Sequence, residues 1–474
     1  MSIVTRFPPS PTGFMHIGTA RTALYNWLYA RRHGGKMLFR IEDTDRARHS
    51  EEAVEAIKNG LKWLELDYDG EVVSQFEQRH RHAEIAQELL KKGEAYECYC
   101  SPQELEEMRV KAKAAGSPQM YDRRWRDSKA TPPADIKPVI RIKAPLSGDS
   151  VVTDHVQGEV RVAAEQLDDF IILRSDGTPT YMLSVVVDDH DMGVTHVIRG
   201  DDHLNNTFRQ NIIYKAMDWK IPEYAHLPLI LGPDGAKMSK RHGAASVEEY
   251  RDMGYLPEAM RNYLLRLGWS HGDDEFISDK QAREWFNLEH IGKSAARFDF
   301  AKLENVNAHY MKEIDPKRLI EISRPFYRRR HDIELNDEAI KRILAGIDEL
   351  KSRAKTILQF VDESVFYARK LPFAYDDKAS ALLDPRILGA IAAKLESFKS
   401  FTADDIQNAC KAIADETGGK LGQVAMPFRA ALTGTTISPS IFHAAEILGR
   451  DETLARLNAP LNQGKTTAKA KTAN

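Results

Sequence analysis

The chain opens, at residues 2–41, with SIVTRFPPSPTGFMHIGTARTALYNWLYARRHGGKMLFRI. The apolar run that ends at Phe7 reads as a strand, and the prolines and glycine of residues 8–13 end it. Apolar residues then recur at helical spacing over residues 20–28, and residues 36–41 read as a second strand. A strand, a tight loop, a helix and a strand are the usual start of a parallel α/β sheet.

The next part of the chain continues this pattern and then departs from it. Apolar spacing predicts amphipathic helices around residues 54–64 and 85–90. Ser101-Pro102-Gln103-Glu104 combines a Ser cap, a proline in the first turn and a Glu that can reach back, which predicts a helix start. Short strands separated by turns follow, so residues 99–190 are expected to form an insertion with its own small fold.

Strand signals return after the insertion. We expect residues 183–187, 194–198 and 227–231 to be buried strands that resume the sheet. From residue 246 onward the sequence reads as almost entirely helical. The polar, basic tail of residues 461–474 is expected to be disordered.

Composition limits the possible classes of protein. A chain of 474 residues suggests about three domains at ~150 residues each. Its 67 basic and 70 acidic residues leave a formal net charge of −3, which excludes a globally basic nucleic-acid binder but not a local basic face. Three cysteines are too few for a disulfide framework, and no apolar run approaches the ~20 residues that span a bilayer. We expect a cytoplasmic protein with no membrane association.

Two loops carry residues suited to binding a polyphosphate. The first, residues 8–18, joins the first strand to the first helix, where open α/β sheets bind ligands and a helix N-terminus offers free N–H groups. Its His16 can donate to phosphate oxygens. The second, residues 232–243, follows a strand and presents Lys237 and Lys240. Taken alone, each loop also reads as an ordinary turn.

Taken together, the two loops resemble the HIGH and KMSKS signatures of class I aminoacyl-tRNA synthetases. The surrounding sequence resembles the bacterial glutamyl-tRNA synthetases in particular. The segments that carry the resemblance are RFPPSPTG at 6–13, MHIGTARTAL at 15–24, RIEDTD at 40–45, GVTHVIRGDDH at 193–203, KMSKR at 237–241, LTG at 432–434 and SP at 438–439.

The resemblance implies a fold class and an order of domains. The class is α/β: a Rossmann-type parallel nucleotide-binding core with an inserted α+β acceptor-binding domain, followed by an all-α C-terminal anticodon-binding region. The expected domains are 1–98 and 191–235 for the halves of the core, 99–190 for the insertion, 236–315 for the lysine loop and a connecting helical domain, 316–460 for the anticodon-binding domain, and 461–474 for the tail.

The resemblance also implies L-glutamate as a substrate. The glutamate side-chain carboxylate suits guanidinium groups, and the implied partners are Arg6 and Arg199. Glu42 is implied to meet the α-ammonium, while Ser10 and Tyr181 offer hydroxyls to the remaining polar atoms. Each residue also has a structural interpretation: a surface arginine pair, a helix-facing glutamate and a core tyrosine.

ATP is the second implied substrate, with Mg²⁺ sharing the phosphate charge. The implied catalytic residues are His16, which faces the phosphates, and Lys237 and Lys240, which stabilise charge as pyrophosphate leaves. The residues implied to bind ATP are Pro9, Ser10, Thr12, Gly13, His16, Gly18, Met238, Ser239, Lys240 and Arg241.

Two departures from the family pattern stand out. Thr19 occupies the last HIGH position, where other class I enzymes carry a second histidine; a hydroxyl or small residue is usual in the glutamate branch. Cys98 and Cys100 resemble half of a four-ligand zinc site, but residues 121–127 lack Cys and His. Two thiolates cannot complete a tetrahedral site, so we predict no zinc there.

The tRNA partner is expected to be tRNA(Glu), and the sequence leaves open whether tRNA(Gln) is charged as well. In the insertion, Arg124 lies in a basic and aromatic segment suited to phosphate contact and base stacking, although a solvated turn fits the same residues. In the helical region, Arg353 is the candidate to face an anticodon base. We expect a monomer.

Three other functions fit the sequence less well. A glutamyltransferase acting on a modified tRNA base would lack the long helical region after residue 310. Glutaminyl-tRNA synthetase of bacteria has a β-rich anticodon-binding part, whereas this one reads helical. A catalytically silent RNA-binding relative would not need His16, Lys237, Lys240 and Arg6 together.

Overall fold

The computed structural model describes residues 2–11, 13–46, 49–116, 121–238 and 246–471, with side chains described up to residue 461. The chain divides into two compact units. The first comprises Met1–Asp252 and Pro257–Phe300, and the second comprises Met253–Leu256 and Ala301–Asn474.

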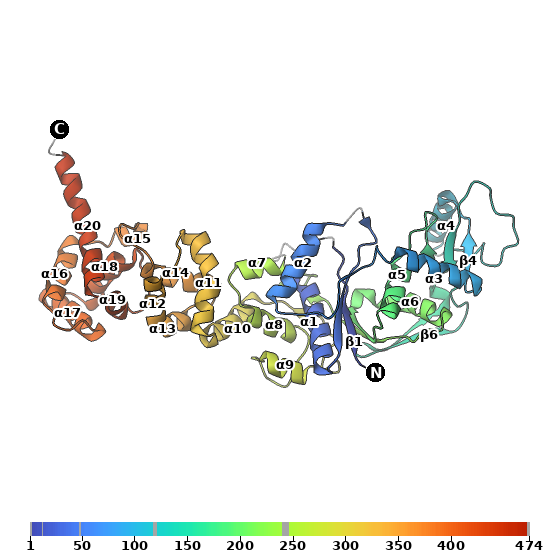
Figure 1. The fold of residues 1–474 in the computed structure, drawn as a ribbon, viewed down its shortest axis with the longest axis horizontal. Coiled ribbons are helices and arrows are strands. Elements are labelled where there is room, and N and C mark those ends of the chain that lie inside the picture. The colour runs from blue at the N-terminus through green and yellow to red at the C-terminus, as the bar shows by residue number, and fades with distance from the viewer. Residues whose placement is uncertain (1, 12, 47–48, 117–120, 239–245, 472–474) are drawn as a thin grey trace. The chain divides into compact units, whose positions relative to one another are not determined.

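The first unit mixes strands and helices (Figure 1). Its elements are β1 (Val4–Phe7), α1 (Ile17–Arg32), β2 (Lys36–Ile41), α2 (Glu51–Trp63), β3 (Val73–Ser74), α3 (Arg79–Lys91), β4 (Ala95–Cys98), α4 (Pro102–Ala114), β5 (Val139–Ile142), β6 (Asp149–Asp154), β7 (Gly158–Ala163), η2 (Ala164–Gln166), β8 (Ile171–Leu173), α5 (Tyr181–Asp191), β9 (His196–Gly200), η3 (Asp201–His203), α6 (Leu204–Ala216), β10 (Glu223–Leu227), β11 (Ile230–Leu231), α7 (Val247–Asp252), α8 (Pro257–Arg266), α9 (Asp279–Trp285) and β12 (Ala296–Arg297).

The main sheet confirms the parallel α/β expectation. Strand β1 pairs in parallel with β2, and β2 with β3. A second sheet, of order β7-β6-β10-β9, has β9, β10 and β6 parallel and β7 antiparallel to β6. The two sheets adjoin at β1 and β9, which contact each other, and the Thr195 N–H just before β9 donates to the Val4 carbonyl over 2.9 Å.

Helices cover the sheet on both sides of β1 (Figure 1). Helix α1 packs on β1 and β9, with α8 and α9 behind it. On the other side, α3, α5 and α6 share one apolar core with β6, β9 and β10; its largest members include Phe208 and Tyr224. Burial of this core holds the carboxyl ends of the central strands in place.

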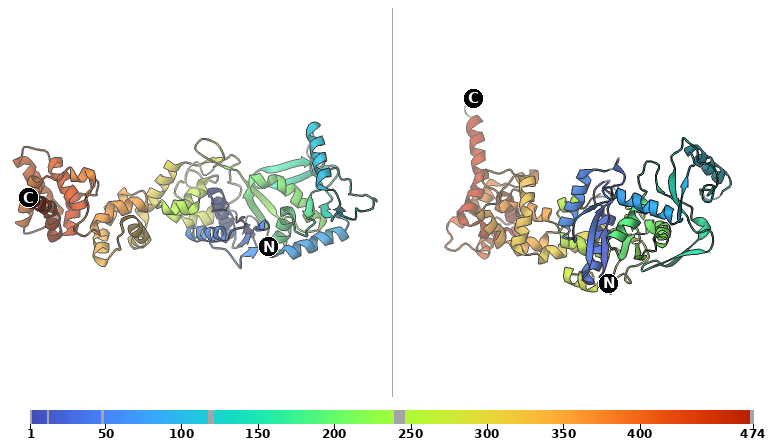
Figure 2. Two further views of the ribbon diagram at one scale, coloured as in Figure 1. Left: turned by 90° about the horizontal axis from the view of Figure 1, so that it is seen from above. Right: turned by 45° about the vertical axis from the view of Figure 1, so that its right-hand side comes forward.

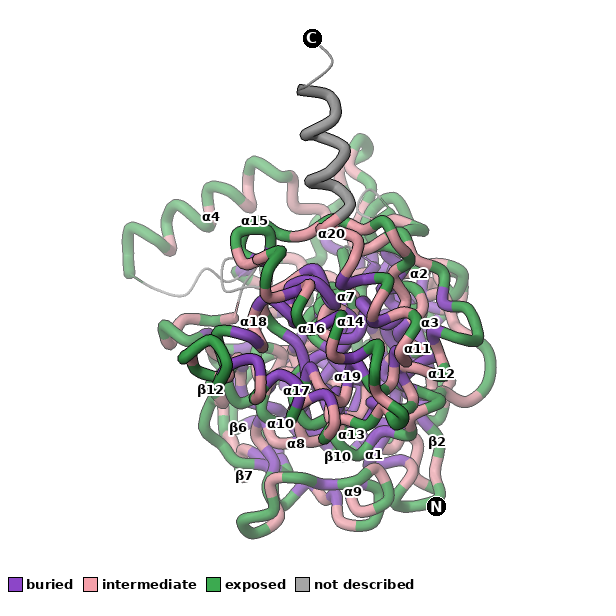
Figure 3. The backbone as a smooth tube through the Cα atoms, turned by 90° about the vertical axis from the view of Figure 1, so that its left-hand side faces the viewer, coloured by how far each residue is buried: buried purple, intermediate pink, exposed green. Residues whose placement is uncertain are grey.

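The insertion carries a small sheet of its own, of order β4-β5-β8 and antiparallel throughout. Helix α4 stands beside these strands (Figure 2). The predicted capping box is present, since Ser101 and Glu104 each accept from the other's backbone N–H. No residue of α4 is buried (Figure 3).

Two strand predictions were wrong. Residues 183–187 form the middle of helix α5, not a strand. A short apolar run that is buried on every side has no periodicity that distinguishes a strand from a helix. Residues 183–187 adopt the helical conformation and pack against α3 and α6. The predicted strand 227–231 is split into β10 and β11, because Pro228 offers no N–H to a sheet ladder.

The second unit is helical throughout its described residues, as predicted. Its elements are α10 (Phe300–Glu313), which begins at the last residue of the first unit, α11 (Pro316–His331), α12 (Asp337–Ala345), α13 (Ile347–Arg353), α14 (Ile357–Ser364), η5 (Val365–Tyr367), α15 (Asp377–Ser380), α16 (Pro385–Glu396), α17 (Ala403–Glu416), α18 (Leu421–Thr433), α19 (Ile441–Leu448) and α20 (Arg450–Lys471).

The tail differs from its expected disorder. Helix α20 continues through it to Lys471. Alanine and lysine, which recur from residue 465 to residue 471, have high helix propensity. None of the helices in the described part of the chain is both long enough and apolar enough to span a membrane.

Candidate active site

The loop between β1 and α1 is organised by His16, which caps the helix. Its Nδ1 accepts from the N–H groups of Gly18 at 3.1 Å and Thr19 at 3.2 Å. Because Nδ1 accepts, the proton of the neutral ring sits on Nε2, which lies 3.0 Å from the Thr19 hydroxyl. Desolvation and then the Lys237 ammonium lower the pKa of His16. The ring is therefore a neutral donor through Nε2.

Gly18 allows this cap to form. A Cβ at this position would lie 3.1 Å from Cε1 of the His16 ring. The sequence implied that the backbone at Gly18 faces phosphates, but its N–H is already bonded to His16. The imidazole Nε2–H in turn faces the Thr19 hydroxyl, so both ring nitrogens of His16 take part in the cap.

The lysine loop folds back on β11 as a tight turn. Gly232 N–H donates to the Ala236 carbonyl at 2.7 Å, and Gly235 has a φ of +80°, which favours glycine. Lys237 is exposed, with Nζ 3.7 Å from Asp202 Oδ2 of η3. Its ammonium also lowers the pKa of His16. The predicted residues Thr12, Ser239, Lys240 and Arg241 lie outside the described residues.

Arg6 is the centre of a buried charge network. Its Nε donates to Asp189 at 3.3 and 3.4 Å, and Arg40 Nη1 donates to the same carboxylate at 2.6 Å. Arg40 Nη2 also reaches Glu42 at 3.1 Å. Nη1 of Arg6 is buried and has no hydrogen-bond partner among the described residues. Since buried donors are nearly always satisfied, this nitrogen indicates a ligand with an acceptor group.

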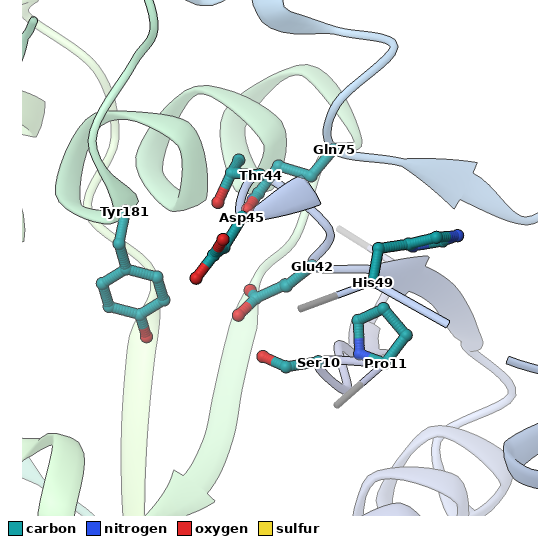
Figure 4. Close-up of a pocket in the computed structure, with 8 residues that line it drawn as sticks. All are labelled: Ser10, Pro11, Glu42, Thr44, Asp45, His49, Gln75 and Tyr181. Carbon is teal, nitrogen blue, oxygen red and sulfur yellow. The ribbon is translucent and has the colours of Figure 1, made fainter. Parts of the chain in front are cut away.

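A cavity of about 300 Å³ opens beside this network. Its lining residues are Ser10, Pro11, Glu42, Thr44, Asp45, His49, Gln75 and Tyr181. Figure 4 shows Glu42, Ser10 and Tyr181 turning their oxygens towards the same space. Pro9 joins the loop to β2 by accepting the Glu42 N–H at 3.0 Å. Three residues predicted for glutamate therefore surround one cavity.

Tyr181 lines the cavity, whereas Arg6 and Arg199 are not among its lining residues. Burial first, and then the Glu42 carboxylate, raise the pKa of its hydroxyl to about 12, while Arg199 and Arg6 oppose that shift. The hydroxyl lies 3.2 Å from His203 Nδ1. Burial also raises the pKa of Glu42, although Arg40 opposes it. A buried carboxyl whose charge is incompletely compensated is well placed to meet a cationic group of a ligand.

Sequence reasoning missed several members of the site. Thr44 and Asp45 stood in the quoted segment 40–45 but received no role, and His49 and Gln75 carried no signal. Asp189, which joins Arg6 to Arg40, was missed because residues 183–187 before it were read as a strand. Only its position on helix α5 turns it towards the arginines.

Asp189 gives a stability prediction. Burial alone would raise its pKa, but Arg6 and Arg40 outweigh that effect and hold the pKa below its usual value. A depressed pKa contributes stability above the unfolded-state pKa, and that contribution is lost as the pH falls through the folded pKa. At pH 7 we expect Asp189→Asn to lose about 3–5 kcal/mol of unfolding free energy, measured by urea unfolding of the full chain.

The matched control for this change is Asp191→Asn on the same helix. Asp191 pairs with Arg81 at the surface, where both side chains are well exposed. Surface pairs contribute less than about 1 kcal/mol. The wild-type advantage over Asp189→Asn should shrink below about pH 4, and equal losses in the two variants at pH 7 would contradict the buried role.

The two cysteine thiols donate weak hydrogen bonds to one tyrosine hydroxyl. Cys98 Sγ lies 3.4 Å from the Tyr121 hydroxyl and Cys100 Sγ lies 4.0 Å from it. Burial, and then Cys98, raise the pKa of the Cys100 thiol to about 11. Arg141 stacks over the Tyr121 ring, with Cζ 3.9 Å from its centroid. Within the described ranges there is no group of three or more His, Cys, Asp or Glu residues that could hold a metal ion.

The two candidate tRNA-binding arginines are exposed and ion-paired. Arg124 donates to Asp122 and to Glu104, at 2.8 and 2.9 Å. Arg353 donates to Glu363 at 2.8 Å. Both guanidiniums are therefore held at the surface by carboxylates that a phosphate or a base could replace.

Comparison with known proteins places this geometry in a family. Residues 2–305 match the family described as "tRNA synthetases class I (E and Q), catalytic domain", and residues 318–461 match "Anticodon binding domain". Glutamate–tRNA ligase 2 of Rhodospirillum centenum is 59% identical over 462 residues, covering 97% of this chain and 99% of that protein. Glutamate–tRNA ligase 2 of Paramagnetospirillum magneticum is 54% identical over 472 residues, covering 98% and 99%.

Solved structures agree with the sequence comparisons. A glutamate tRNA ligase from Elizabethkingia meningosepticum, crystallised in complex with its amino acid, superposes with a TM-score of 0.83 at 31% identity, covering 97% of this chain and 99% of that one. Glutamate-tRNA synthetase from Elizabethkingia anophelis gives a TM-score of 0.80, with the same identity and coverage.

Proposed function

The chain belongs to the class I tRNA synthetases for glutamate and glutamine and is a glutamate–tRNA ligase, and from this premise we propose how its residues share the reaction. The enzyme activates L-glutamate with ATP, releases pyrophosphate and transfers glutamate to the terminal adenosine of tRNA. Little covalent chemistry is asked of the protein, so its residues act by positioning and electrostatics.

We assign glutamate recognition to the cavity beside Arg6. Arg6 and Arg199 bind the side-chain carboxylate, Glu42 binds the α-ammonium, and the Ser10 and Tyr181 hydroxyls bind the remaining polar atoms. The observation that carries this assignment is the buried Nη1 of Arg6, which lacks a partner among the described residues. A carboxylate is the acceptor that complements a guanidinium best.

We assign ATP to the two signature loops. His16 donates through Nε2–H, Lys237 and Lys240 stabilise the charge that develops on the leaving pyrophosphate, and the glutamate carboxylate attacks the α-phosphorus in line. Support comes from the Lys237 ammonium, which lowers the pKa of His16. Mg²⁺ would supply further neutralisation of the phosphate charge. The residues assigned to hold the nucleotide are Pro9, Ser10, Thr12, Gly13, His16, Gly18, Met238, Ser239, Lys240 and Arg241.

We assign tRNA binding to the insertion and the helical region. Residues 99–190 hold the acceptor end, with Arg124 on a phosphate, and residues 316–460 read the anticodon, with Arg353 facing a base. The surface ion pairs of both arginines support this role, because a nucleic acid can replace the carboxylates.

Residues 1–98 with 191–235 act as the catalytic core, and 236–315 connect it to the anticodon-binding part. We place the enzyme in the cytoplasm as a monomer.

A charging assay with both purified tRNAs tests the assignment of the acceptor. We expect transfer of glutamate to tRNA(Glu), and the same assay with tRNA(Gln) decides between discriminating and non-discriminating behaviour. Pyrophosphate exchange with and without tRNA shows whether activation requires tRNA. Activation of glutamate without transfer to either tRNA would contradict the assigned acceptor.

We propose that the insertion needs no zinc. Cys98 and Cys100 pack against Tyr121 in a small apolar core, and burial keeps the Cys100 thiol protonated. Treatment with EDTA should therefore leave the unfolding temperature unchanged, measured by differential scanning calorimetry, since only proteins with structural metal lose stability to a chelator. Stoichiometric zinc after dialysis, together with a lower unfolding temperature in EDTA, would overturn this expectation.

A further inference from the structure

Arg199 is held by a different kind of partner from Arg6. Its Nη2 donates to the Thr207 hydroxyl at 2.6 Å and to the Gln210 amide oxygen at 2.8 Å. Its Nε donates to His226 Nε2 at 3.2 Å. Its Nη1 has no hydrogen-bond partner among the described residues.

His226 is fixed by a buried carboxylate behind it. Its Nδ1 lies 2.6 Å from Asp154 Oδ2, and both side chains are fully buried. Asp154 also accepts the N–H groups of Val156, Gln157 and His226 itself. A carboxylate that accepts this many hydrogen bonds stays ionised, and its pKa is lowered by His226 against the effect of burial. It holds the imidazole proton on Nδ1.

Three contacts of the ring define one protonation state, because Nε2 also lies 3.0 Å from the Thr207 hydroxyl. Nδ1–H donates to Asp154, and the unprotonated Nε2 accepts from Arg199. Burial lowers the pKa of His226, and Arg199 lowers it further, although Asp154 opposes them. If the ring were protonated, its Nε2–H and the Arg199 Nε–H would both be donors and would face each other.

The hydrogen-bond acceptors around Arg199 are thus all uncharged, whereas Arg6 shares the carboxylate of Asp189. A buried cation that lacks an anionic partner attracts an anionic ligand more strongly than a neutral one. We infer that His226, kept neutral and oriented by Asp154, is a positioning residue that leaves the charge of Arg199 unbalanced, so that the pocket selects a carboxylate over an amide. This inference rests on the proposed glutamate-binding role of Arg199.

The charged groups around His226 come from several elements. They are Asp154 of β6, Arg199 of β9, Arg6 of β1, and Asp201 and His203 of η3. Because Arg199 donates directly to His226, protonation of the ring would remove this contact at the proposed glutamate pocket. The KM for glutamate should rise only at a pH below 6.5, the ordinary value for histidine.

The first experiment tests the Asp154 contact and the Arg199 contact of His226 separately. His226→Asn keeps a group near Asp154 but removes the acceptor at Nε2, and His226→Gln places an amide oxygen where Nε2 lies. In aminoacylation of tRNA(Glu), we expect His226→Asn to raise the KM for glutamate about tenfold or more while kcat changes little. His226→Gln should recover part of that loss. The matched control is His196→Asn, at a buried histidine of β9 that contacts Thr195 and Glu223 instead.

The second experiment restores a counter-charge. Gln210→Glu places a carboxylate against Arg199 Nη2, and Asn211→Asp adds the same charge on helix α6 beside Tyr224. We expect Gln210→Glu to lower the preference for L-glutamate over L-glutamine about tenfold or more, measured as the ratio of glutamine Ki to glutamate KM. Asn211→Asp should leave that ratio near the wild-type value.

The outcomes distinguish this inference from the proposed function. If Arg199→Ala leaves the KM for glutamate unchanged, the proposed role of Arg199 fails and the inference fails with it. If Arg199→Ala raises that KM but His226→Asn matches its His196→Asn control, only the inference is overturned. Equal selectivity ratios in Gln210→Glu and Asn211→Asp would also overturn it.

Discussion

Replacement of Arg6 by Gln is expected to lower kcat/KM for glutamate by about 10²- to 10⁴-fold. The guanidinium is 1% exposed and shares Asp189 with Arg40. Removing one member of a buried group of paired charges typically costs about 3–5 kcal/mol of free energy. Each ~1.4 kcal/mol corresponds to a tenfold change in binding. The glutamine amide cannot offer the bidentate fork to a carboxylate. Steady-state aminoacylation at varied glutamate concentration measures the effect.

Arg31→Gln is the matched control for Arg6→Gln. Arg31 lies on helix α1 and pairs with Asp67 and Asp69 near the surface. We expect its kcat/KM for glutamate to stay within about twofold of the wild type, because surface pairs contribute less than ~1 kcal/mol. A folded Arg6→Gln enzyme with an unchanged KM for glutamate would contradict the assignment of Arg6 to the substrate carboxylate.

Replacement of Lys237 by Ala is expected to lower kcat for adenylate formation by about 10²- to 10³-fold, with the KM for glutamate nearly unchanged. The ammonium lowers the pKa of His16, and in the proposed mechanism its charge stabilises the leaving pyrophosphate. Losing one such electrostatic donor typically costs this much. Single-turnover formation of glutamyl-adenylate in the presence of tRNA measures it.

The control for Lys237→Ala is Lys58→Ala. Lys58 pairs with Glu55 on the surface of helix α2, and its removal should leave the rate within about twofold. A Lys237→Ala variant that raised the KM for glutamate and kept kcat would place the lysine at the amino-acid pocket instead of the phosphates.

The fold could be predicted where local pattern determines it. Strand β2 spans the predicted residues 36–41, and the Ser101 capping box forms as its spacing requires. The helical region after residue 300 also follows from apolar spacing. The one element of the wrong type, α5, is an apolar run whose burial on all sides hides the period that would distinguish a helix from a strand.

The site could be predicted only in part. Tyr181 was implied by the family resemblance, and all the predicted roles stay predictions. The motifs singled out Arg6, His16, Glu42, Arg199 and Lys237 as candidates, because each stands in a recognisable segment. They did not locate Asp189, Asp154 or His226, which act on the arginines from other elements. Hydrogen-bond partners of a buried group are chosen by packing, and no local spacing records that choice.

By itself the sequence determined most of the alternation of strands and helices and located the two signature loops, since these depend on short-range periodicity and on motif spacing. Tertiary structure decided which charges meet. Arg6 and Asp189 are 183 residues apart, and Asp154 and His226 are 72 apart. Pairing over such distances follows from how strands and helices pack, because burial forces each charged group to find a partner wherever the fold places one.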